Sequence, residues 1–99
     1  MISISLIKLE GTKIEEEFNA VSPITFRAFR VLRKLKAIHV DLNRVGQEIG
    51  LQRAPLHRSL RALINREFVT DDYRITKCGL LQMQTCTKIL ENIVWRNLA

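Results

Sequence analysis

Hydrophobic and polar positions change their spacing several times along the chain, and each change marks an expected element. Residues 2–9 (ISISLIKL) begin with alternation of hydrophobic and polar side chains, which is the periodicity of a β-strand. Residues 13–18 either return as a second strand or, at Glu15–Glu17, start a helix. From residue 22 onward most hydrophobic positions recur at the spacing of α-helices.

The first segment with helical spacing is expected to run from Ser22 to about Lys36. Ser22 can accept a hydrogen bond from an N–H of the first turn, and Pro23 suits the first helical position. The hydrophobic stripe of this helix consists of Ile24, Ala28, Val31, Leu32 and Leu35, whereas Arg27, Arg30 and Lys34 occupy another face. Residues 38–40 (IHV) are short and apolar enough for a small strand.

Two shorter helical segments follow, separated by a glycine. Asp41 is expected to cap a helix over residues 42–49, and Gly50 then reverses the chain with a positive φ. Gln52 takes the N-cap place of the next helix, and Pro55 is tolerated in its first turn. The core face of this second helix carries Leu56, Leu60, Leu63 and Ile64. Two helices joined by so tight a turn predict a helix-turn-helix.

The rest of the chain predicts a small hairpin and a long helix. Residues 68–76 have the composition of two short strands around an Asp71–Asp72 turn, and Thr76 is expected to cap the final helix. That helix has an apolar stripe that looks too wide for one thin domain to cover, which favours a homodimer. The expected interface residues are Leu80, Met83, Cys86, Leu90, Ile93 and Val94.

Together these elements fit one domain over residues 1–99. It would have an N-terminal strand or arm at 1–21, a core at 22–76 and a dimerisation helix at 77–99. The net charge is +6, and residues 27–66 hold ten Lys and Arg against only Asp41 and Glu48. The excess positive charge therefore coincides with the expected helix-turn-helix. Such a concentration is typical of proteins that bind phosphate-rich partners.

Several other classes of site receive no support from the residue pattern. Cys78 and Cys86 fit neither a CxxC pair nor a zinc site, and the chain has only two His. We interpret both cysteines as small buried side chains, although a bridge between subunits stays open. Without a Gly-rich phosphate loop, a nucleophile–base pair or a carboxylate pair in apolar surroundings, we expect no enzyme activity, metal or cofactor. The chain shows neither a signal-peptide layout nor a membrane-spanning run, so we expect a cytoplasmic protein.

The stretch from Asp41 to Gly79 resembles prokaryotic winged helix-turn-helix repressors of the MarR and ArsR type. The matching positions are Leu42, Val45, Gly46, Ile49 and Gly50, then Leu60 and Leu63, then Glu67-Phe68-Val69, and finally Ile75-Thr76-Lys77-Cys78-Gly79. The resemblance implies a mainly α fold with a small β-hairpin, the wing, and a long C-terminal dimerisation helix. The architecture is also similar to that of small dimeric winged-helix proteins of archaeal viruses and plasmids. Glu67 departs from the family, which usually has Gly there, and the Asp71–Asp72 wing tip would repel phosphate.

In a helix-turn-helix the second helix lies in the major groove and its N-terminal residues meet base edges. The outward residues expected to bind DNA there are Gln52, Arg53, Ala54, Pro55, His57, Arg58 and Arg61. Among these, Gln52, Arg53, His57 and Arg58 are assigned to bases, because Gln suits adenine and Arg suits guanine. We expect Arg61, Asn43, Arg44 and Arg74 to hold phosphates.

The function that these features favour is that of a homodimeric transcription repressor, which binds double-stranded DNA sequence-specifically. Two alternatives stay open. One is a DNA-architectural or replication-associated protein that binds without sequence preference. The other is an adaptor that uses the same fold to bind another protein.

Overall fold

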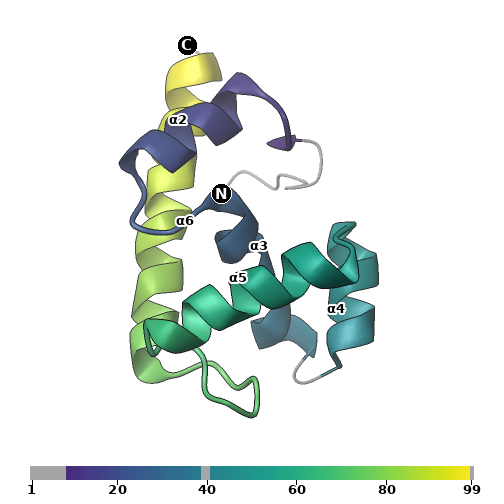
Figure 1. The fold of residues 1–99 in the computed structure, drawn as a ribbon. Helices are drawn as coiled ribbons and strands as arrows, with labels where there is room; N and C mark the ends of the chain where they lie inside the picture. The colour runs from purple at the N-terminus through teal and green to yellow at the C-terminus, as the bar shows by residue number, and fades with distance from the viewer. Residues whose placement is uncertain (1–8, 39–40, 99) are drawn as a thin grey trace.

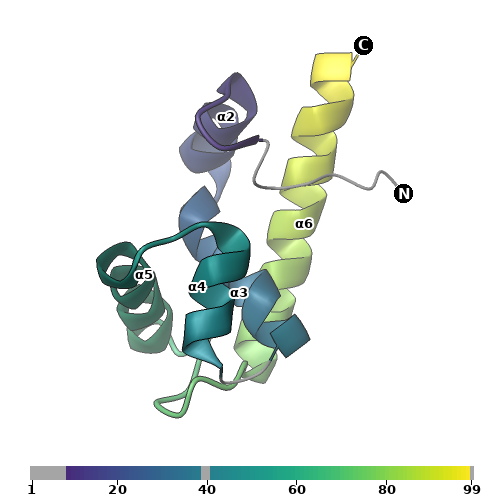
Figure 2. The ribbon, with the colours of Figure 1, turned by 90° about the vertical axis from the view of Figure 1, so that its right-hand side faces the viewer.

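The computed structural model describes residues 9–38 and 41–98. Within these ranges the chain forms five helices, named α2 (Lys13–Val21), α3 (Phe26–Ile38), α4 (Leu42–Ile49), α5 (Arg53–Asn65) and α6 (Lys77–Leu98). The helix α6 runs along one side of the molecule, and α2 and α3 pack against it (Figures 1 and 2). α5 crosses in front of α3 in Figure 1, with α4 beside its N-terminal end.

Contrary to expectation, the fold is not a winged helix with a β-hairpin. In the described part of the chain, residues 68–76 form only an isolated antiparallel bridge between Val69 and Ile75. The Thr70 hydroxyl bonds the Asp72 carboxylate and accepts a hydrogen bond from the Arg74 amide at 3.1 Å. Such side-chain bonds hold the backbone in a tight turn instead of a strand ladder. Tyr73 also has a positive φ of 65°, which ends the extended conformation.

The start of this loop explains how the chain turns without the glycine that the resemblance led us to expect. Glu67 itself takes the left-handed conformation, with φ 63°. Its amide donates to the Ile64 carbonyl at 2.9 Å, and the Phe68 amide donates to the Leu63 carbonyl at 3.0 Å. This is the Schellman pattern that closes a helix C-terminus. The Phe68 amide is thereby used by α5 and cannot join a strand ladder.

At the N-terminal end the expected arm proves to be partly helical. Residues 13–21 form α2, so the helical alternative at Glu15–Glu17 is confirmed and the second strand is wrong. The expected strand over residues 2–9 lies outside the described residues except for Leu9. The buried Phe18 of α2 contacts two rings of α3, with centroids 5.4 Å from Phe26 and 5.3 Å from Phe29. This aromatic cluster fastens α2 to α3.

The helix α3 begins later than expected. Thr25, not Ser22, provides the capping hydroxyl, which accepts from the Ala28 amide at 3.1 Å. Asn19 of α2 accepts from the Phe26 amide at 2.8 Å, so α2 helps to cap α3. Ser22 instead ends α2. At the other end, Ile38 is the last residue of α3 instead of the start of a strand, and residues 39–40 lie outside the described ranges.

The hydrophobic core contains most of the residues that were assigned to a dimer interface. The structure buries Met83, Cys86, Leu90, Ile93 and Val94 of α6 inside the single chain. The chain covers them itself, because α2 adds a layer that the hydrophobic pattern of the sequence did not specify. These five residues therefore belong to the core of the single chain and are not available to a second copy. Of the proposed interface only Leu80 is exposed.

Candidate nucleic-acid interface

The two central helices form the expected helix-turn-helix. The side chain of Asp41 accepts a hydrogen bond from the Arg44 amide at 3.2 Å and so caps α4. Gly50 follows α4 with φ 71°, a conformation that a residue with a Cβ adopts only with strain. The Leu51 amide then donates to the Gly46 carbonyl at 3.0 Å, which closes the turn before α5. The Asp41 cap and the reversal at Gly50 are local features, and both were predicted from the sequence.

The helix α5 has two distinct sides. Its inner side is formed by Leu56, Ser59, Leu60 and Leu63, which are buried. The outer side, which we call the α5 basic face, consists of Gln52, Arg53, Ala54, His57, Arg58 and Arg61, all exposed. Pro55, assigned to the same side from the sequence, is half-buried. In Figure 1, α5 is the helix nearest the viewer, and no other described helix lies in front of it.

Charge on the α5 basic face is not neutralised within the described residues. Arg53, Arg58 and Arg61 make no ion pair there. The N-cap residue Gln52 makes no side-chain capping bond, so the first amides of α5 stay open to an external acceptor. An unpaired cationic face beside a helix N-terminus attracts anions by both its side chains and its backbone.

The positive surface continues from α5 onto α3. Arg27 and Arg58 line the same groove of about 400 Å³, which also contains Pro55, Asn19 and the acidic Glu15. Arg27 was recognised from the sequence only as part of a polar helix face. Its proximity to α5 is a tertiary feature, because the two residues are far apart in the chain. The structure thus adds Arg27 to the candidate residues.

Of the two α4 residues that were assigned to phosphates, one already has an acidic partner. Asn43 and Arg44 are exposed. However, Arg44 Nε lies 3.0 Å from a carboxylate oxygen of Glu48, and Lys34 Nζ lies 3.5 Å from the other oxygen. Arg44 would have to release or share Glu48 to hold a phosphate, so it is a weaker candidate than the unpaired arginines of α5.

The remaining candidate, Arg74, lies in the loop between α5 and α6. Its Nε is 3.1 Å from the Asp72 carboxylate. The hydrogen bond from the Thr70 hydroxyl, helped by Arg74, holds the pKa of Asp72 below its usual value. The Asp72 carboxylate therefore competes with phosphate for Arg74.

One residue that the sequence placed on the polar face of α3 is not available for DNA. Arg30 is buried, with its Nη1 at 3.2 Å from Glu10 and its Nη2 bonded to the Ile49 carbonyl. Ile49 ends α4, so Arg30 supports the helix-turn-helix from inside. The sequence pattern cannot distinguish Arg30 from its exposed neighbour Arg27.

Other kinds of site find little support in the described ranges. No group of three or more His, Cys, Asp or Glu there can hold a metal ion. Cys86 is buried, whereas Cys78 is exposed at the start of α6, which corrects half of the expectation for the cysteines. None of the helices traced at 13–38 and 42–98 has both the length and the hydrophobicity needed to cross a lipid bilayer.

Comparison with known proteins adds no relative to this description. No protein-family model, curated protein or solved structure matches the chain. The resemblance to winged-helix repressors therefore depends on the residue pattern alone. It does not extend to the wing, because no hairpin forms in the described residues 68–76, where the wing was expected.

Proposed function

We propose that the protein binds double-stranded DNA by inserting the α5 basic face into the major groove. The observation that supports this most directly is the set of exposed arginines on α5 with no acidic partner among the described residues. The net charge of +6 adds long-range attraction to a polyanion. A short helix, a tight turn and a second exposed helix are the geometry by which small proteins present side chains to base edges.

The residues of this surface divide into two roles. Arg53, His57 and Arg58 lie in the N-terminal half of α5 and Gln52 is its N-cap residue, at the end where recognition helices approach bases. Arg61, Asn43 and Arg27 are suited to phosphates, because they are exposed. Arg27 in addition lines a groove together with Pro55 and Arg58 of α5. We assign Arg44 and Arg74 to phosphates only as secondary contacts, since each already has a carboxylate partner. Binding of this kind at a promoter would repress transcription.

The test is titration of the full-length protein with duplex DNA selected from a random pool, alongside unselected duplex. Arg58→Ala is expected to weaken binding to the selected site by about 1–3 kcal/mol, the value of one bidentate base contact. Arg96→Ala is the matched control, because it removes one exposed positive charge from the far end of α6. The control is expected to bind like the wild type.

Three outcomes separate this function from its alternatives. Affinity that falls steeply with added salt supports contacts to phosphates, because each such contact releases counterions. Equal loss on selected and random DNA would make Arg58 a phosphate contact and favour a protein without sequence preference. Binding to neither DNA, with a folded protein, would contradict the proposal and favour the adaptor role.

A further inference from the structure

Several large hydrophobic side chains of α6 are exposed on the side that faces away from the core. Leu81, Trp95 and Leu98 are 63%, 60% and 67% exposed. Figure 2 shows α6 at the right-hand edge of the molecule, and all the other labelled helices lie to the left of it. Exposed leucine and tryptophan on one helix side are typical of a surface that another molecule covers.

The exposed side of α6 has the spacing of a coiled-coil seam. Leu81, Lys88 and Trp95 are separated by seven residues each, and Gln84, Glu91 and Leu98 follow the same period three residues later. Alternate steps of three and four residues place side chains on one stripe of a helix. We call these six residues the outer seam. It lies opposite the buried stripe that contains Met83, Cys86, Leu90 and Ile93.

We propose that the outer seam pairs with the same seam of a second copy of this chain, with the two α6 helices antiparallel. In such a two-fold antiparallel pair, the residue number on one helix and the residue number that it faces on the other always add up to the same value. The register that sets Leu81 against the second copy's Leu98 also sets Lys88 against the second copy's Glu91. By symmetry each of these contacts occurs twice, and Gln84 faces Trp95. The seam is therefore complementary to itself in charge and in hydrophobicity.

Charge also decides the direction of the helices. A parallel pair would set Lys88 against Lys88 and Glu91 against Glu91, and facing like charges are unfavourable. In the antiparallel register each Lys meets a Glu. Neither Lys88 nor Glu91 makes an ion pair with another described residue, so both are open to a partner's charge.

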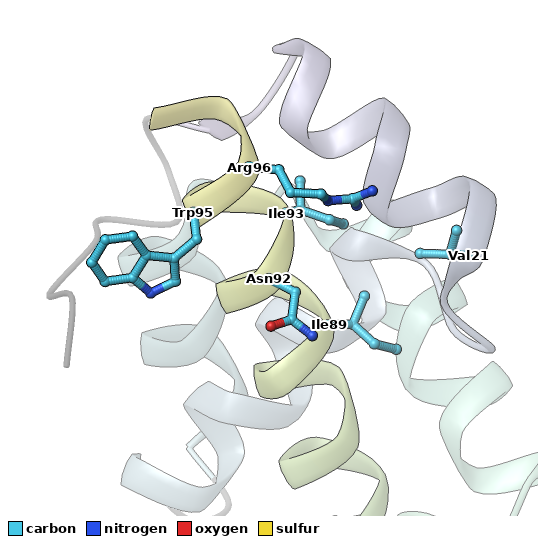
Figure 3. A pocket seen from close by; sticks show the side chains of 6 residues that line it. All are labelled: Val21, Ile89, Asn92, Ile93, Trp95 and Arg96. Carbon is cyan, nitrogen blue, oxygen red and sulfur yellow. The ribbon is translucent and has the colours of Figure 1, made fainter. Parts of the chain in front are cut away.

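A groove beside the Trp95 end extends the apolar surface. It measures about 560 Å³ and is lined by Val21, Ile89, Asn92, Ile93, Trp95 and Arg96 (Figure 3). Figure 3 shows Ile89 and Val21 on the side where α2 lies, whereas Trp95 projects away from α6. A second helix along the outer seam would cover Trp95 and the margin of this groove. This pairing does not depend on the proposed binding to DNA.

The experiment measures the mass of the full-length chain by sedimentation equilibrium from about 1 µM to about 500 µM, a range that includes weak interfaces. The wild type is expected to become dimeric within this range. Lys88→Glu alone and Glu91→Lys alone each create like-charge contacts and are expected to weaken dimerisation at least tenfold. The double variant, which exchanges the two charges, is expected to dimerise again. Lys36→Glu, with the same change in net charge on α3, is the matched control and is expected to dimerise like the wild type.

Trp95 provides a second, independent measurement, because it is the only tryptophan in the chain. Its fluorescence maximum is expected to shift to shorter wavelength as the protein concentration rises, and this shift should be lost in Lys88→Glu. A wild type that stays monomeric over the whole range would overturn the proposal. Equal dimerisation of Lys88→Glu and the wild type would also overturn it, as would a double variant no better than the single ones. Circular dichroism of each variant confirms that the fold is retained.

Discussion

Arg30 carries a positive charge into the interior, where its side chain is 2% exposed. Burying a charge is costly unless other groups replace its water. Glu10 supplies a carboxylate at 3.2 Å, and the carbonyl of Ile49 accepts a second hydrogen bond. A cation at the C-terminal end of α4 also interacts favourably with the helix dipole. Nε has no hydrogen-bond partner among the described residues, so the charge depends heavily on Glu10.

We expect Glu10→Ala to destabilise the protein by about 1–3 kcal/mol, because it leaves the Arg30 charge buried without a counterion. The half-exposed position of Glu10 reduces this loss, since water can reach its site. Glu10→Ala combined with Arg30→Met is expected to be more stable than Glu10→Ala alone, because Met fills similar space without a charge. Unfolding in urea measures the stability of both variants.

The matched control for this pair is Glu16→Ala, which removes an exposed carboxylate of α2 that makes no ion pair with the described residues. It is expected to change stability by less than about 0.5 kcal/mol. If the double variant proves less stable than Glu10→Ala alone, the bond to the Ile49 carbonyl outweighs the cost of the uncompensated charge, and our interpretation of Arg30 is wrong.

The environment of Arg30 could not have been predicted from its spacing along the chain. Arg27, Arg30 and Lys34 follow one another at helical intervals, yet only Arg30 is buried. Its burial depends on Glu10 and Ile49, which lie in other elements. The side chains of the α5 basic face were easier to place, because a helix with a complete hydrophobic stripe leaves only its opposite side for the solvent.

At the scale of elements, the loop between α5 and α6 lies closely against the first turn of α6. Gly79 is buried there. A Cβ added to Gly79 would lie 2.1 Å from the carbonyl oxygen of Phe68, which already occupies that space. The Thr76 amide donates to the same carbonyl at 3.1 Å, so Phe68 cannot move aside without losing that bond. Only a residue without a side chain allows this approach.

Gly79→Ala is therefore expected to destabilise the protein, at or above the upper end of the range of about 1–3 kcal/mol for overpacked sites. Alanine favours helix formation more than glycine does, so a gain in stability is the expectation from helix propensity alone. Cys78→Ala, in the same turn but exposed, is the control and should be nearly neutral. Thermal unfolding of the two variants distinguishes these effects. A Gly79→Ala protein as stable as the wild type would contradict the close approach.

The elements differed in how well they could be predicted, for physical reasons. The bounds of α4 and the reversal at Gly50 follow from local signals, namely a capping Asp and a residue that tolerates positive φ. The expected hairpin failed because Thr70 and the C-terminus of α5 use the hydrogen-bonding groups that a ladder needs. The role of α2 depends on Phe18, whose aromatic partners in α3 cannot be inferred from periodicity.

On the scale of the whole molecule, the two proposed surfaces lie on different helices. The helices α5 and α6, which carry the α5 basic face and the outer seam, lie on different sides of the molecule, as Figures 1 and 2 show. Between them lie α3 and the hydrophobic core. A second copy on α6 would therefore leave α5 accessible to DNA, and a dimer would present two basic faces related by a two-fold axis.

If both proposals hold, the dimer is expected to prefer DNA that carries two copies of the selected site over DNA that carries one. Linked binding converts the second contact into an intramolecular step, and the gain is expected to be at least tenfold at the best spacing. Lys88→Glu should bind a single site like the wild type but lose the preference for two sites, and the Lys88→Glu, Glu91→Lys double variant should regain it. Duplexes with one or two sites at varied spacing, titrated at protein concentrations where the wild type is dimeric, provide the measurement. If the Lys88→Glu protein keeps the full preference for two sites, the recognition of paired sites does not depend on the outer seam.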